Sequence, residues 1–144
     1  MGIEELRVFI GEWELEVGLP GAEGVRGHVV FEALGDVLVQ RISVPVPGAP
    51  DSLSVVVTGA DGSYVQHYFD TRGVARLYAM SFDGTLWTLQ RSTPDFSPLD
   101  FHQRYVGGFN DDRTTLDGEW QTSDDGRAWR QDFPQTLRRL RTAR

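Results

Sequence analysis

The chain has 144 residues, the size of one ordinary domain, with a formal net charge of −7 and a sequence pI near 4.8. It contains no cysteine, which excludes disulfides, thiolate metal sites and thiol nucleophiles. All 14 basic residues are arginine, so a phosphate-loop lysine and a Schiff-base lysine are excluded as well. The acidic balance argues against nucleic acid and anionic membranes as partners.

The first residues predict a short helix and no export signal. Ile3, Leu6, Phe9 and Ile10 recur at helical spacing, which indicates an amphipathic helix over residues 3–10. The same stretch is acidic and lacks the apolar core of a secretory signal. No apolar run approaches the roughly 18 residues that a membrane-spanning helix needs. We therefore expect a cytoplasmic protein.

From Trp13 onward the apolar period changes from helical to two. Trp13, Leu15 and Val17 alternate with glutamates, which is typical of a half-buried strand. Further strands are predicted over residues 25–34, 37–44, 53–59, 63–70, 74–82, 85–92, 100–109, 113–122 and 127–133.

Turn signals separate these strands at short intervals. Asp-Gly at 61–62, 83–84 and 125–126 readily supplies the positive φ angles of tight turns. Prolines concentrate in two longer loops, 45–52 and 93–99, which we expect to form the lips of a cavity. About ten antiparallel strands would leave two exposed edges in an open sheet, and closing the sheet removes both edges. The sequence therefore predicts an all-β fold, an antiparallel meander β-barrel with a short N-terminal helix.

Several predicted strands carry a strongly polar side chain among bulky apolar ones on the same face. Arg76 shares a face with Tyr78, and Arg91 shares one with Trp87. A packed sandwich core would bury these guanidinium groups at high cost, whereas a barrel with a partly wet interior accommodates them. We expect residues 1–144 to form a single barrel domain of this kind.

The start of the first predicted strand resembles a known signature. The helix followed by Gly11-Glu12-Trp13 is similar to the Gly-x-Trp motif of lipocalins. The resemblance implies that the tryptophan plugs one end of the barrel beneath an arginine from a late strand. Arg130, Arg138 and Arg139 are alternatives for that arginine. The number of strands resembles the wider calycin superfamily, which includes fatty-acid-binding proteins and nitrobindin-like barrels.

The middle of the chain carries a second resemblance. The stretch from Tyr68 to Tyr78 is similar to an uncharacterised family of small bacterial barrels, which the chain resembles most closely. Fatty-acid-binding proteins hold a ligand carboxylate with an Arg-x-Tyr pair, and Arg76 and Tyr78 have this spacing, although in mid-chain rather than in the last strand. A planar guanidinium fork and a phenol donor suit a carboxylate. The alternative is a structural ion pair between Arg76 and a carboxylate such as Asp70.

These observations favour a small-molecule-binding barrel for a mainly apolar ligand with an acidic group. One alternative is a small barrel enzyme that uses interior Asp, Glu and Tyr side chains as acid and base, and another is a non-catalytic module that forms homodimers. We expect Arg41 and Arg104 to point outward with their stems over apolar surface. The residues predicted to line the binding site are Trp13, Gln66, Tyr68, Arg76, Tyr78, Trp87, Arg91, Gln103 and Tyr105.

Neither a metal site nor a catalytic centre is predicted. His28, His67 and His102 lie on different predicted strands and form no His-x-His or His-x-x-x-His pair. The haem ligand of nitrobindin comes from near the C-terminus, and no histidine follows His102, so we expect no haem and no other cofactor. Asp117 and Glu119 share a strand face, but no second feature supports a hydrolase.

The end of the chain is basic on an otherwise acidic body. Arg138, Arg139, Arg141 and Arg144 follow the last of the 21 acidic residues. We expect this tail to close the barrel through Leu137 and to contact the acidic surface, and a partner-binding arm is the alternative.

Overall fold

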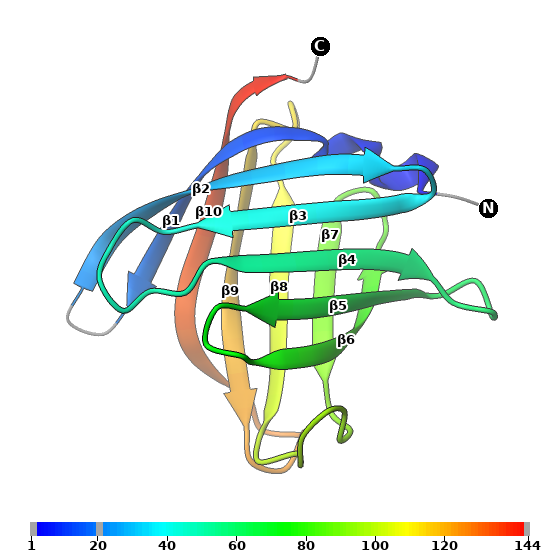
Figure 1. Cartoon of the computed structure of the whole chain (residues 1–144), viewed down its shortest axis with the longest axis vertical. Coiled ribbons are helices and arrows are strands. Elements are labelled where there is room, and N and C mark those ends of the chain that lie inside the picture. Colours follow the sequence, from blue (N-terminus) through cyan, green and yellow to red (C-terminus); the bar gives the residue numbers. More distant parts are fainter. Residues whose placement is uncertain (1–2, 20–21, 143–144) are drawn as a thin grey trace.

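The computed structural model describes residues 3–19 and 22–142, and this part of the chain forms a closed antiparallel β-barrel (Figure 1). A short 3-10 helix, η1 (Glu4–Phe9), precedes the strands. Each strand pairs with the strands before and after it in the chain, and β1 pairs with β10 to close the sheet. The strands are β1 (Gly11–Leu19), β2 (Ala22–Leu34), β3 (Val37–Ser43), β4 (Ser52–Thr58), β5 (Tyr64–Asp70), β6 (Ala75–Phe82), β7 (Leu86–Arg91), β8 (His102–Phe109), β9 (Thr115–Ser123) and β10 (Arg130–Thr142).

The meander gives the barrel two different ends. Because successive strands are antiparallel, the connections alternate between the end that carries η1, the helix end, and the opposite loop end. The connections β3–β4 and β7–β8, which contain the predicted loops 45–52 and 93–99, therefore lie at the same loop end. The all-β meander barrel predicted from the sequence is confirmed.

The Asp-Gly pairs terminate strands by a repeated local geometry. Gly84 has a φ of 99°, a conformation that favours glycine. Asp83 accepts hydrogen bonds at Oδ1 from the backbone N–H groups of Thr85 and Leu86 at 2.9 and 2.7 Å. The carboxylate therefore satisfies backbone donors that a strand would otherwise pair, and the chain reverses.

The helix end is sealed by aromatic packing beneath a guanidinium group. Trp13 is fully buried, and its indole Nε1 donates to the carbonyl oxygen of Phe9 at 2.8 Å. The guanidinium carbon of Arg139 lies 4.1 Å from the centroid of the Trp13 ring. Arg139 also donates to the carbonyl oxygens of Val8 and Ile10 at 2.6 and 3.0 Å. Of the three arginines considered from the sequence, Arg139 is the one that covers the tryptophan.

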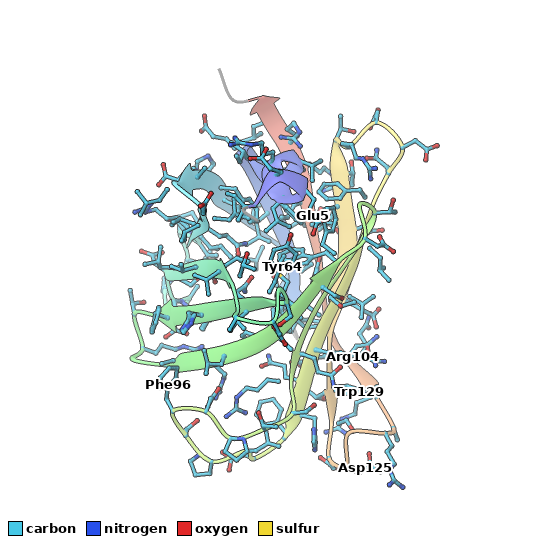
Figure 2. The ribbon with its side chains drawn as sticks, turned by 90° about the vertical axis from the view of Figure 1, so that its right-hand side faces the viewer. Glu5, Tyr64, Phe96, Arg104, Asp125 and Trp129 are labelled. Carbon is cyan, nitrogen blue, oxygen red and sulfur yellow. The ribbon has the colours of Figure 1, made fainter. Side chains whose placement is uncertain are left out.

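A second contact fixes η1 on the barrel. Figure 2 shows Glu5 of η1 and Tyr64 of β5 next to each other. The Tyr64 hydroxyl donates to the Glu5 carboxylate, so the helix is joined to a strand on the side away from β10. This hydrogen bond, together with desolvation by burial as the larger cause, raises the pKa of Tyr64 to about 12.

The last strand is longer than the sequence predicts. A strand predicted over 127–133 would end before Pro134, because proline has no N–H to donate to a sheet. β10 instead continues past this proline to Thr142 and pairs with β1. The register between β9 and β10 shifts between Gln131 and Phe133, so the proline lies beside an irregularity in the sheet.

The basic tail is part of this strand and closes the barrel. Leu137 is buried and lies opposite Leu15 of β1. Arg138 points outward and donates to the Glu16 carboxylate at 2.6 Å. The prediction that the tail closes the barrel and contacts the acidic surface is confirmed for these residues.

Arg139→Ala should lower the free energy of unfolding by about 2–3 kcal/mol, because it removes the cation–π contact and the hydrogen bonds to backbone carbonyls at the helix end. Urea unfolding followed by tryptophan fluorescence measures this loss. The neighbouring Arg138→Ala is the control and should cost less than about 1 kcal/mol, since it breaks only an exposed ion pair. Equal losses for the two variants would contradict this role of Arg139.

Candidate functional site

Four polar side chains form a row across neighbouring strands on the inner face of the barrel. The strand register places Gln40 opposite Ser54, Ser54 opposite Tyr68, and Tyr68 opposite Arg76. Gln40 and Ser54 are buried, whereas Tyr68 and Arg76 are half-buried. Arg76 lies on the same face of β6 as the buried Tyr78, because side chains two residues apart share a face. We call Gln40, Ser54, Tyr68 and Arg76 the polar row.

Arg76 is an inward cation whose charge is not neutralised by an ion pair. It makes no hydrogen bond or salt bridge with any of the described residues. The alternative pairing with Asp70 is wrong, because Asp70 accepts from Arg72 Nη2 at 2.7 Å and from the Tyr68 hydroxyl at 2.8 Å. Arg72 lies in the same turn as Asp70, two residues away, and therefore occupies the carboxylate in place of Arg76.

The buried Asp70 side chain is held in its charged form. Burial alone would raise its pKa, but hydrogen bonds from Arg72 and Tyr68 outweigh this and lower the pKa to about 2. Burial and the neighbouring Asp70 raise the pKa of Tyr68 to about 12. At neutral pH Asp70 is therefore a carboxylate and Tyr68 is a neutral phenol. A carboxylate with so low a pKa does not suit a general base that must take up protons at neutral pH.

Next to the polar row lie three of the other predicted site residues. Gln66 is on the same face of β5 as Tyr68 and one inward position closer to the helix end. Its Oε1 atom is buried and has no hydrogen-bond partner among the described residues. The Tyr78 hydroxyl donates to Gln103 Oε1 at 2.9 Å, and burial raises the Tyr78 pKa. The structure therefore places Gln66, Tyr78 and Gln103 together near Arg76.

The side chains of the inner face are more exposed to solvent at the loop end than at the helix end. Phe9 and Phe31, at the helix end, are buried, and their ring centroids lie 5.2 Å apart. At the loop end Arg76, Gln103 and Trp120 are only half-buried although they face the interior. Solvent therefore reaches the inner face from the loop end, next to the polar row.

Arg91 faces the interior as predicted, but its charge is neutralised by an acid. Its side chain is almost fully buried, and Nε and Nη2 donate to the two carboxylate oxygens of Asp95 at 2.7 and 2.9 Å. Asp95 also accepts from the backbone N–H of Leu77 at 3.0 Å. The Arg91 guanidinium holds the pKa of Asp95 well below its usual range, against the effect of burial. The pair anchors the β7–β8 loop against β6.

The remaining predicted site residues lie deeper in the barrel. Trp13 is the plug beneath Arg139, and Trp87 packs on Phe9 with ring centroids 5.0 Å apart. The Trp87 Nε1 atom is buried without a hydrogen-bond partner in the described part of the chain. Tyr105 is fully buried and packs on Trp87 with centroids 5.1 Å apart. Trp13, Trp87 and Tyr105 are thus brought together, but toward the helix end rather than beside Arg76.

Arg41 and Arg104 point outward, as expected. Arg41 donates to the Glu32 carboxylate at 2.6 Å. Figure 2 shows Arg104 and Trp129 close together toward the loop end, where the guanidinium carbon lies 4.2 Å from the ring centroid. Both guanidinium groups are therefore placed outside the barrel.

Acid–base and metal chemistry find little support in the arrangement. Asp117 is exposed and accepts a hydrogen bond from Thr136, while Glu119 accepts from Gln121 and Gln131. Among the carboxylates with a resolved shift, each pKa is lowered rather than raised. Within residues 3–19 and 22–142 no group of three His, Asp or Glu side chains is placed to hold a metal ion.

A hollow of about 560 Å³, the outer hollow, lies at the loop-end edge of the sheet and is lined by both outward and inward side chains. Its walls come from β2 to β5 and from the ends of the β3–β4 and β5–β6 connections. Several of its side chains point outward because they alternate with buried inward ones. The lining residues are His28, Val30, Arg41, Ile42, Ser43, Asp51, Ser52, Leu53, Phe69, Asp70 and Thr71.

Comparison with known proteins supports the fold alone. No protein-family model and no curated protein matches the sequence. Among solved structures, the chain is similar to the crystal structure of Rv2717c from M. tuberculosis, with a TM-score of 0.61 and 16% sequence identity. The match covers 96% of this chain and 97% of that one. In the described residues no helix is long and apolar enough to cross a membrane.

Asp95→Ala should lower the free energy of unfolding by about 3–5 kcal/mol, because it leaves the Arg91 guanidinium buried without its partner. Replacing both residues, with Arg91→Met and Asp95→Leu, should recover most of that loss. Urea unfolding of the variants measures both effects. Glu32→Ala, which breaks the exposed pair with Arg41, is the control and should cost less than about 1 kcal/mol. A double variant no more stable than Asp95→Ala would contradict this account.

Proposed function

We propose that the protein is a calycin-like barrel that binds a small, mainly apolar ligand with an acidic group, and that Arg76 anchors the acid. The observation that carries the proposal is the free charge of Arg76 on a half-buried inner face. A buried or half-buried cation without a protein partner is costly, and an anionic ligand removes that cost. Rv2717c supports the barrel, since the likeness to it extends over nearly the whole chain.

The neighbouring inward arginine does not compete for the same ligand. Arg91 is neutralised by Asp95, and Arg72, in the β5–β6 connection at the loop end, is neutralised by Asp70. Among the described arginines that face the interior at this end of the barrel, Arg76 therefore keeps an uncompensated positive charge, which matches one carboxylate.

The rest of the ligand would contact apolar side chains on the inner face. Tyr64, Trp120 and Phe133 are partly buried and pack against the core, and Tyr78 and Trp120 lie with ring centroids 5.7 Å apart. Apolar burial against these rings supplies affinity, while a few polar groups fix the orientation. Trp120 also provides an intrinsic fluorescent probe for binding.

Octanoate should quench tryptophan fluorescence on binding, and Arg76→Leu should weaken its affinity by about 10–100-fold, the worth of hydrogen bonds to a charged group. The matched control is Arg41→Leu, which removes an outward arginine and should leave the affinity unchanged. Neutral 1-octanol should bind wild type and Arg76→Leu equally. If Arg76→Leu binds octanoate as wild type does, the carboxylate anchor is refuted.

A second candidate function, a module that forms homodimers, is favoured by an apolar outer sheet face. On β1 the outward residues are Glu12, Glu14 and Glu16, as expected for a solvated surface. The outward residues of β4, β5 and β6 differ, because none is a carboxylate or a guanidinium. This apolar outer face consists of Leu53, Val55, Val57, Val65, His67, Phe69, Ala75, Leu77 and Ala79. Exposed apolar patches of this kind mark interaction surfaces.

We propose a second copy of this chain as the occupant. A partner that covers the face must itself present no unpaired charge, and an identical face meets this condition. Phe69 is 41% exposed and forms part of the wall of the outer hollow, as Leu53 does. A two-fold axis near Phe69 would place the ring of each copy against the hollow of the other, the reciprocal fit that a symmetric dimer requires.

Sedimentation equilibrium over a range of protein concentrations tests the dimer. Wild type should show a concentration-dependent monomer–dimer equilibrium, and Phe69→Glu should shift it to monomer because the dimer would bury two unpaired carboxylates. Leu140→Glu is the matched control, since Leu140 is 54% exposed on β10, on the opposite side of the closed sheet from β5. A wild-type protein that stays monomeric at millimolar concentration would refute the dimer.

A further inference from the structure

The interior contains buried polar side chains that the acid anchor does not use. Gln40, Ser54 and Gln66 are 4%, 2% and 3% exposed. None of the three side chains makes a hydrogen bond with the described residues, and the Gln66 Oε1 atom is fully enclosed. Buried polar groups in native proteins are nearly always hydrogen-bonded, so the Gln66 acceptor calls for a partner that is not part of the chain, and the Gln40 and Ser54 side chains beside it are free to bind the same partner.

Other polar side chains on the inner face are already satisfied. Gln103 accepts from Tyr78, and Gln135 Oε1 accepts from the Trp120 indole at 3.2 Å. Unpartnered buried nitrogens also occur in the Trp87 indole on β7 and the His102 ring on β8, whereas Gln40, Ser54 and Gln66 lie together on β3, β4 and β5, the strands next to Arg76. Their unmet hydrogen bonds therefore cluster on one side of the proposed acid site.

We propose that the ligand is a hydroxylated carboxylic acid whose hydroxyl group binds to Gln40, Ser54 and Gln66 while its carboxylate binds to Arg76. This inference rests on the proposed function and specifies the ligand class for the same site.

The register gives the separation of the two groups. Ser54 lies two strands away from Arg76 in the polar row, through Tyr68. Neighbouring strands are about 4.8 Å apart, and inward side chains converge, so the second group lies about 5–10 Å from the carboxylate. That distance corresponds to a hydroxyl well along an alkyl chain and not to one next to the carboxylate.

The hydrogen-bonding capacity of these side chains distinguishes between the polar groups of similar size that a ligand could carry. A glutamine amide and a serine hydroxyl each donate and accept hydrogen bonds. A ligand hydroxyl also does both, whereas an ether or a ketone oxygen only accepts and leaves the Gln66 acceptor unpaired. A second carboxylate would be buried among neutral groups without a cation, which is costly. The uncharged hydroxyl is therefore the group that fits.

Titration of tryptophan fluorescence with octanoate, 8-hydroxyoctanoate and 8-methoxyoctanoate tests the inference. The hydroxy acid should bind about tenfold more tightly than octanoate, because it satisfies buried groups, and the methoxy acid should show no such gain. If the hydroxy acid binds no more tightly than octanoate, the side chains are satisfied by water alone and the inference is overturned.

Variants separate this inference from the acid anchor. Gln66→Leu and Ser54→Ala should abolish the gain of the hydroxy acid and leave octanoate binding unchanged, whereas Arg76→Leu should weaken both acids alike. Gln90→Leu, on the outward face of β7, is the matched control and should keep the gain. A gain that persists in both Gln66→Leu and Ser54→Ala would refute the hydroxyl site even if Arg76 binds the acid. Urea unfolding midpoints confirm that each variant is folded before titration.

Discussion

The pairing of β1 with β10 is the constraint on which the rest of the structure depends. It closes the sheet, brings Arg139 over Trp13, and fixes the C-terminal end of η1 through the carbonyls of Val8 and Ile10. Because this seal lies at the helix end, the interior is dry there, and solvent reaches the inner face from the other end. The half-buried polar groups therefore lie at the loop end, which this seal does not cover.

The interior arginines show how the same side chain serves different purposes according to its partners. Arg139 stacks on an aromatic ring and donates to backbone carbonyls, and burial lowers its pKa. Arg91 is held by Asp95, which makes it part of the support of a loop. Arg76 has neither kind of partner within the described residues, so its charge is available to a ligand. In a chain without lysine, this distinction is the reason that we propose Arg76 as the acid anchor.

Much of the fold follows from local patterns, and the site follows from them only in part. Alternation and Asp-Gly turns predict most strands, because both depend on neighbours in the sequence. The prediction that the last strand ends before Pro134 was wrong, because the register shift that accommodates the proline depends on the pairing with β9 and is not visible in the pattern of one strand. The sequence offered Arg76 as the partner of Asp70, but Arg72 pairs with this carboxylate because it lies in the same turn, two residues from Asp70. Gln40 interrupts the apolar face that Leu38 and Ile42 form on β3, and that signal in the sequence could have revealed it. Ser54 gave no such signal, because it shares its face of β4 with Ser52 and Thr58 and the more apolar face of that strand points outward.

Nuclear magnetic resonance of arginine side chains tests the central claim most directly. The Nε–Hε signal of Arg76, assigned by comparison with Arg76→Leu, should shift when octanoate is added, because a carboxylate would become its hydrogen-bond acceptor. The Arg91 signal should keep its position, since Asp95 already occupies that guanidinium. An Arg76 signal that does not move while tryptophan fluorescence reports binding would contradict the account.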